Sequence, residues 1–284
     1  EIMSSDWSSD VCSSDLVRRS VGQLVATGFV EMICRPFSDD RGRPENLYCL
    51  TRKGVDLLKA EGVLDQKISY NRVIWEGRQS LDHQLGVNWV LISAVHMERN
   101  STLNAECLSQ TSPFPPHGKN GTCFIQDTVP SDDDSSEPVS FIPDAVIAVS
   151  RPDSDNAALF FVEVDRSTQS LAGRVDSQNT IRKKILNYQA YYQTEGYRRY
   201  EETFGSRMKG FRVLFVCSSP CRLSKMCALV RSLPPSNFIW LATQREILAK
   251  GLGAPVWIEG GDASSDKVSI LGEKYEFESP TCII

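Results

Sequence analysis

Two apolar stretches that carry carboxylates decide the fold: Phe141-Ile-Pro-Asp144-Ala-Val-Ile-Ala-Val149 and Ala158-Leu-Phe-Phe-Val-Glu163-Val-Asp165. Each stretch has the length of a buried strand, and a short polar loop joins them, so the pattern predicts neighbouring antiparallel strands. Alternation along the second strand places Glu163 and Asp165 on one face. Because Asp144 stands at the same end of this pair of strands, pairing would bring all three carboxylates close together.

Clustered carboxylates at a sheet end provide the hard oxygen ligands that Mg²⁺ prefers. Asp144 and Glu163 are the candidate metal ligands, and Asp165 is a further candidate catalytic carboxylate. The residues leave three alternatives open. The cluster suits a Mg²⁺-dependent nuclease, a non-catalytic DNA-binding protein whose carboxylates form salt bridges, or an interaction protein whose acidic strand ends are solvated.

Composition indicates a globular chain with room for two ordinary domains, since 284 residues are 41% hydrophobic and 24% charged. No apolar run approaches the ~18 residues that a membrane span needs. Nine cysteines, an odd number without Cys-x-x-Cys spacing, favour reduced thiols in a cytoplasm. A net charge of −5 argues against a generally basic nucleic-acid binder. No glycine-rich phosphate loop is present, so no ATP or NAD cofactor is predicted.

The first sixteen residues contain a Ser-Ser-Asp unit three times, as in Ser4-Ser-Asp and Ser13-Ser-Asp. We expect residues 1–16 to be a sequence artefact or a disordered tail, and exclude them from the fold prediction. This interpretation implies that part of the first domain is missing.

Residues 17–66 show the order of a winged helix: helix, strand, charged loop, strand, helix. The predicted elements are a helix over Val17–Val25 that ends at Thr27-Gly28, strands over Phe29–Cys34 and Asn46–Leu50, and a helix over Arg52–Glu61 capped by Thr51. Basic side chains gather here, and the candidate DNA-binding residues are Arg18, Arg19, Arg41, Arg43 and Arg52. Arg41 and Arg43 stand in the loop that forms the wing. The alternative is a basic hairpin that serves dimerisation or packing.

After a connector over residues 67–81, residues 82–258 alternate strands and helices and predict a mixed α/β sheet, with a long loop over 109–139 and a tail over 259–284. The predicted elements after the two acidic strands are a helix over Ser177–Thr194, a strand over Phe211–Cys217, a helix over Cys221–Leu233, a strand over Phe238–Ala242 and a helix over Gln244–Lys250.

Two kinds of side chain in these helices need an interpretation. Helical spacing places Ile181, Ile185, Tyr188 and Tyr192 on one face. His83, in a buried helix over Asp82–Met97, is interpreted as a hydrogen-bonded or exposed histidine and not as a metal ligand.

The order Pro143-Asp144, then Glu163-x-Asp165, then a helix with lysines and Tyr188 resembles the restriction-endonuclease-like nuclease core. With the winged-helix pattern before it and Phe211-Arg-Val-Leu-Phe-Val after it, the chain resembles the bacterial replication-relaxation family. That resemblance implies a protein of plasmid or mobile-element replication or mobilisation.

The nuclease core also implies roles for residues. Asp144 and Glu163 would hold Mg²⁺, and a lysine two positions after the glutamate would orient the attacking water. This chain has Asp165 there, so we expect Lys183 or Lys184 to replace that lysine and choose Lys184 as the candidate catalytic residue. Tyr188 is expected to face the core with its hydroxyl at the edge of the site.

The predicted function is that of a cytoplasmic, non-membrane protein that binds double-stranded DNA without catalysing a reaction. The alternative is a Mg²⁺-dependent nuclease or nickase that uses Asp144 and Glu163. Besides DNA, a second copy of the chain or other replication and mobilisation proteins are candidate partners.

Overall fold

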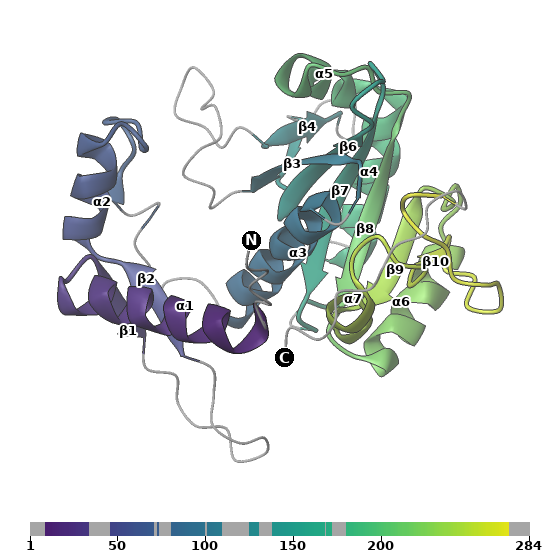
Figure 1. The fold of residues 1–284 in the computed structure, drawn as a ribbon. Helices are drawn as coiled ribbons and strands as arrows, with labels where there is room; N and C mark the ends of the chain where they lie inside the picture. The colour runs from purple at the N-terminus through teal and green to yellow at the C-terminus, as the bar shows by residue number, and fades with distance from the viewer. Residues whose placement is uncertain are drawn as a thin grey trace, which may run out of the picture. The chain divides into compact units, whose positions relative to one another are not determined.

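The computed structural model describes residues 9–33, 46–70, 73, 81–99, 101–109, 125–130, 138–167, 169–171 and 180–272. The chain divides into two compact units, and the division falls between Arg78 and Gln79 (Figure 1).

The first unit contains two helices and a two-stranded antiparallel sheet. Its elements are α1 (Ser9–Ala26), β1 (Val30–Ile33), β2 (Leu47–Leu50) and α2 (Arg52–Ala60). The register of the sheet pairs Val30 with Leu50 and Ile33 with Leu47. Helix α1 begins eight residues before the predicted start, inside the segment 1–16.

Close backbone packing fixes the junction of β1, β2 and α2. Gly28 ends α1 with a positive φ of 72°, as predicted from Thr27-Gly28. The Thr51 hydroxyl donates to the carbonyl of Gly28 at 2.6 Å, and its oxygen caps α2 by accepting from the Gly54 N–H at 3.2 Å. A Cβ added at Gly54 would lie 2.1 Å from the Phe29 carbonyl oxygen, so only glycine fits there.

The element order of this unit is the one predicted for a winged helix, and the winged-helix assignment itself stays a prediction. Arg18, Arg19 and Arg52 are exposed. Arg41 and Arg43, predicted in the wing, lie outside the described residues.

The second unit is built around a six-stranded sheet. Its elements are α3 (Leu81–Arg99), β3 (Asn104–Ser109), β4 (Asp127–Val129), β5 (Val139–Phe141), β6 (Ala145–Ser150), β7 (Ala157–Asp165), α4 (Ile181–Gln193), the 3₁₀ helix η2 (Gly196–Arg198), α5 (Arg199–Phe204), β8 (Phe211–Cys217), α6 (Pro220–Arg231), β9 (Ile239–Thr243), α7 (Gln244–Lys250) and β10 (Ile258–Glu259). The strand order is β10-β9-β8-β7-β6-β3, with β4 and β5 paired separately.

The sheet is mixed, so the predicted mixed α/β class is confirmed. Strand β6 pairs antiparallel with β3 and with β7, and β10 pairs antiparallel with β9, whereas β7, β8 and β9 are parallel. Parallel neighbours need crossover connections. These contain α4 and α5 between β7 and β8, and α6 between β8 and β9. The C-terminal ends of the three parallel strands therefore share one edge of the sheet, and their N-terminal ends share the other.

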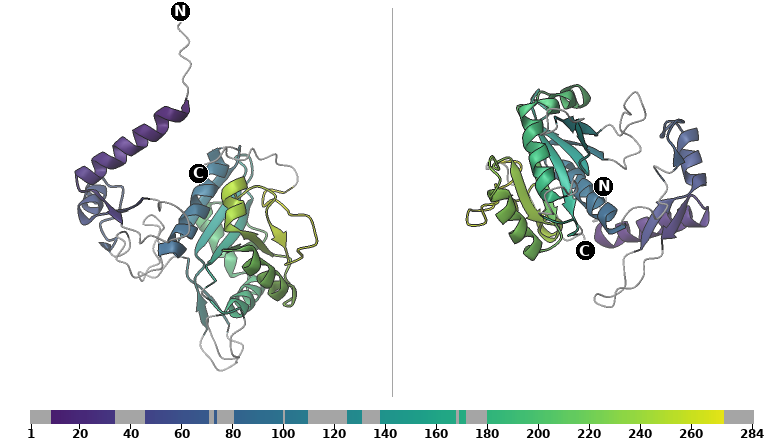
Figure 2. Two further views of the ribbon diagram at one scale, coloured as in Figure 1. Left: turned by 90° about the horizontal axis from the view of Figure 1, so that it is seen from below. Right: turned by 180° about the vertical axis from the view of Figure 1, so that it is seen from behind.

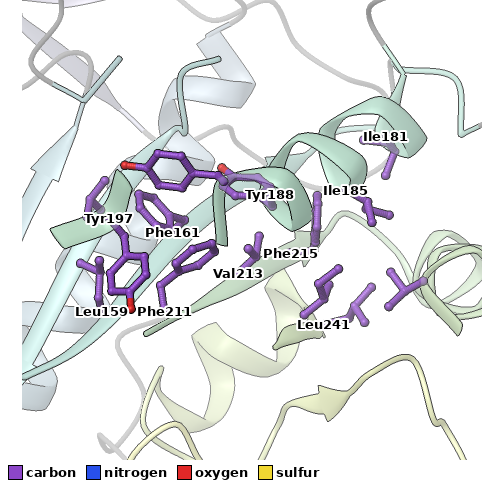
Figure 3. Close-up of a cluster of buried hydrophobic side chains, with 14 of the residues drawn as sticks. Leu159, Phe161, Ile181, Ile185, Tyr188, Tyr197, Phe211, Val213, Phe215 and Leu241 are labelled. Atoms are coloured by element: carbon purple, nitrogen blue, oxygen red, sulfur yellow. The ribbon is translucent and has the colours of Figure 1, made fainter. Parts of the chain in front are cut away.

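Helices cover both faces of the sheet (Figures 1 and 2). Helices α4 and α6 pack on one face in an aromatic-rich cluster around Phe161 and Phe211, and α3 and α7 pack on the other around Trp257. Figure 3 shows Ile185 and Tyr188 of α4 directed at Phe161 and Phe215 of the sheet. Because the central strands are buried on both faces, they read as continuous apolar runs.

Several short elements differ from the prediction. Strand β4 lies inside the segment 109–139 that was predicted as a loop, and β3 and α5 were not predicted. Three-residue strands carry too little periodicity to be recognised, and tertiary pairing with β5 decides β4. On α4, the structure buries Tyr191 where the helical spacing predicted Tyr192, which is 43% exposed. Among the described helices, none combines the length and apolar character that crossing a membrane requires.

Candidate functional site at the carboxylate cluster

The end of the β6–β7 pair holds Asp144 in place through the backbone. The Asp144 N–H donates to the Val162 carbonyl at 3.0 Å, which continues the strand ladder one residue before β6. Its Oδ2 atom accepts from the Val164 N–H at 2.7 Å. Asp144 therefore lies beside the backbone that carries Glu163, as the hairpin prediction required.

Glu163 is buried under α4 and is only 3% exposed. Its Oε2 accepts from the Lys184 ammonium at 2.5 Å, and its Oε1 accepts from the Tyr188 hydroxyl at 2.7 Å. Helix α4 presents Lys184 and Tyr188 one turn apart, so a single helix face satisfies both oxygens of the carboxylate. Of the two candidate lysines, the structure brings Lys184 to Glu163. Tyr188 lies in the core with its hydroxyl at the site, as predicted.

The charges at this point are strongly coupled. Burial raises the pKa of Glu163 and Lys184 offsets part of that effect, whereas the neighbouring Asp144 charge adds to it. Burial acts to lower the pKa of Lys184, but the charges of Glu163 and Asp144 outweigh it, and the net pKa is raised. The ammonium therefore stays protonated and provides the positive charge that the buried carboxylates need.

His83 joins the cluster from the first turn of α3. Its Nε2 atom lies 3.0 Å from Asp144 Oδ1. The hydrogen bond with Asp144 raises the pKa of His83 in spite of partial burial. The interpretation as a hydrogen-bonded histidine is confirmed, but sequence analysis did not assign it to this site. Sixty-one residues separate the partners, and no local signal connects them.

Asp165 shares a strand face with Glu163, as alternation predicted, yet it has a different partner. Arg222 of α6 binds it through two hydrogen bonds, from Nε at 2.6 Å and from Nη2 at 2.9 Å. The same guanidinium donates to the Gln169 carbonyl at 2.7 Å. Both side chains are nearly buried, so this bidentate pair is an internal ion pair that links β7 to α6.

Arg166 directly follows the end of β7. Its Nη2 lies 3.6 Å from Asp82 Oδ2, and its Nη1 donates to Gln244 at 3.4 Å. It therefore ties the strand end to α3 and α7 and does not contact the three carboxylates through these bonds.

The restriction-endonuclease-like resemblance implies a divalent ion, and the donor set does not fit one as it is arranged. Both oxygens of Asp144 and both oxygens of Glu163 accept a hydrogen bond from the same chain. The Lys184 ammonium lies against Glu163, where a bound cation would compete with it. Within the described part of the chain, no group of three or more histidine, cysteine, aspartate or glutamate side chains is arranged to hold a metal.

Comparison with known proteins bears on this arrangement. The family model for replication-relaxation matches residues 4–206. The chain belongs to the replication-relaxation family. No curated protein and no solved structure gives a match. In this replication-relaxation protein the matched range includes Asp144, Glu163 and Lys184, and it ends before β8, so Arg222 lies outside it.

Proposed function

We propose that this replication-relaxation protein binds double-stranded DNA during plasmid or mobile-element replication or mobilisation, and that its carboxylate cluster is structural rather than catalytic. The observation that carries the second statement is charge compensation. Asp144, Glu163 and Asp165 each bind a side chain of the same chain, namely His83, Lys184 and Arg222. Removal of one partner from such a pair leaves an uncompensated buried charge, so these pairs support a structural role for the cluster.

Family membership and the first unit support the DNA-binding part of the proposal. The unit has the element order of a winged helix, and Arg18, Arg19 and Arg52 are exposed on it. Phosphate contacts from such side chains position a protein on a duplex. Work on DNA would take place in the cytoplasm, and the thiols of Cys107, Cys217, Cys221 and Cys227 are compatible with reduced surroundings.

Salt-dependent binding to a labelled random-sequence duplex tests the DNA-binding part. Each phosphate contact contributes about 0.9 to the slope of log affinity against log salt, so Arg41→Ala with Arg43→Ala should lower that slope by roughly two. The matched control is Arg231→Ala with Arg245→Ala, which removes two exposed arginines of the second unit. Equal binding by both double variants would show that the predicted wing does not contact DNA.

One observation favours the alternative of a Mg²⁺-dependent nuclease or nickase. Lys184 reaches Glu163 from the following helix, in place of the lysine that the nuclease core carries at the position of Asp165. Supercoiled plasmid incubated with Mg²⁺ or Mn²⁺ separates the two functions. Unchanged plasmid supports the proposal. Nicked product that disappears with both Glu163→Gln and Asp144→Asn would replace it with the nuclease.

A further inference from the structure

A hollow of about 750 Å³ opens at the other edge of the sheet, where β7, β8 and β9 begin. It lies at the start of β7, whereas the carboxylate cluster lies at the end of the same strand. A smaller hollow of about 410 Å³ adjoins it, since both are lined by Asn156 and Lys209. In Figure 3, Leu159 and Phe211 mark this end of the core, far from Ile181.

Tyr192 gives the hollow an aromatic wall. Its ring stacks on Tyr197 at 6.1 Å between centroids and packs against Phe238 at 5.6 Å, so its position is fixed from behind. It still leaves 43% of its surface exposed. Gly210 lines the same wall, and a Cβ there would lie 3.2 Å from the Tyr192 hydroxyl. A supported, half-open aromatic ring is a surface on which a planar ligand can stack.

Three carboxamide side chains line the hollow together with this ring: Asn156, Gln193 and Asn237. All three are exposed, and their amide groups hydrogen-bond no residue in the described part of the chain. The fourth amide in the lining is not exposed to a ligand in this way. Gln189 donates to the carbonyls of Leu233 and Pro235 and so links α4 to the loop before β9. Carboxamides form paired hydrogen bonds with the edges of nucleobases.

The charges of the two hollows favour an anion. Four cations line them, against two acids: Arg198, Arg207, Lys209 and Arg212 against Glu201 and Glu259. Arg198 is ion-paired with Glu195 and Glu201, so the positive excess comes from the other three cations. Arg212 is held over the Trp240 ring at 4.8 Å. This local positive excess belongs to a chain with a net charge of −5, so it does not reflect the overall composition.

We infer that this hollow binds a nucleotide, with the base stacked on Tyr192, the amides at its edge and the phosphate on Lys209 and its neighbouring cations. Aromatic stacking beside a cationic track is how single-stranded nucleic acid is held, and it is tolerant of sequence. The nucleotide belongs either to single-stranded DNA or to a free nucleotide pool. The site is separate from both the carboxylate cluster and the duplex binding proposed for the first unit.

Fluorescence anisotropy with labelled oligothymidylate tests this inference on the full chain. We expect Tyr192→Ala to weaken binding about tenfold, and Lys209→Ala and Gln193→Ala to weaken it several-fold. Lys225→Ala, which removes an exposed lysine of α6, is the charge-matched control and should bind like the wild type. Thermal melting of each variant identifies any loss of fold. If Tyr192→Ala unfolds, the binding measurements on Gln193→Ala and Lys209→Ala test the inference instead.

Competition with unlabelled thymidine monophosphate distinguishes the two sources. Displacement of the oligonucleotide indicates that one free nucleotide fills the site, and lack of displacement assigns it to single-stranded DNA. The variant Arg41→Ala with Arg43→Ala should keep oligonucleotide binding even if it loses duplex binding. The inference is overturned if the wild type does not bind oligothymidylate, or if all three pocket variants bind like Lys225→Ala.

Discussion

The two ends of strand β7 differ in how their polar groups are satisfied. At its C-terminal end, Glu163 and Asp165 are buried and each binds a cation of the same chain. At its N-terminal end, Asn156 and the nearby Gln193 are exposed, and their amides bind no described residue. Polar groups that fold against one another contribute to stability, whereas polar groups left open are available to a ligand. Our two proposals therefore assign a structural role to one end of the strand and ligand binding to the other.

The largest expected effect is the loss of the Glu163 carboxylate. Glu163→Ala leaves a Lys184 charge and a Tyr188 hydroxyl without their partner, and should lower the free energy of unfolding by about 3–5 kcal/mol. Glu163→Gln keeps an oxygen for these donors and should lose less than half of that. Urea denaturation measures both. A Glu163→Ala variant as stable as the wild type would indicate a strained functional site rather than a structural pair.

Removal of the Tyr188 hydroxyl should have the next largest effect. The hydroxyl donates to a buried carboxylate at 2.7 Å, so Tyr188→Phe should cost about 1.5–3 kcal/mol. Tyr197→Phe is the matched control, because it removes a hydroxyl from the same aromatic cluster without breaking a hydrogen bond to a described residue. Similar losses in the two variants would contradict a specific role for the Tyr188–Glu163 bond.

The contact between His83 and Asp144 should be smaller and dependent on pH. The pKa of His83 is raised above 6.5 in the folded chain. The stabilisation of the fold by this contact is therefore full below pH 6.5 and is lost as the pH rises through the raised pKa. Because His83 is partly exposed, we expect less than about 1 kcal/mol. His83→Gln donates to Asp144 at every pH and should flatten the fall in stability that begins above about pH 6.5. If the His83→Gln variant loses stability with pH as steeply as the wild type, another titrating group causes the pH dependence.

The smallest change in stability is expected at the open end of the sheet. Gln193→Ala should change the free energy of unfolding by no more than about 0.5 kcal/mol, because the side chain is exposed and its amide hydrogen-bonds no described residue. Its expected effect lies in oligonucleotide binding alone. A destabilisation comparable to that of Tyr188→Phe would remove the contrast between the two ends of β7.

Elements with a strong pattern were predictable from the sequence. The bounds of β8 (Phe211–Cys217) and α7 (Gln244–Lys250) agree with the prediction, since one is a continuous apolar run and the other follows a capping Thr243. Strand β3, the pair β4–β5 and α5 were missed, because their short stretches carry little periodicity and long-range pairing decides them. Tyr191 and Tyr192 differ by one helix position, and neither spacing nor residue type told them apart.

The sequence by itself determined the mixed α/β class, the β6–β7 pair and the common face of Glu163 and Asp165, because strand alternation is a local property of the backbone. Only the tertiary structure decided that these two carboxylates have different partners. Lys184 and Arg222 come from two crossover helices, and His83 comes from a third helix far earlier in the chain. Which charged side chains pair depends on how the helices pack across the sheet. The spacing of residues along the chain does not determine the distance between side chains on different helices.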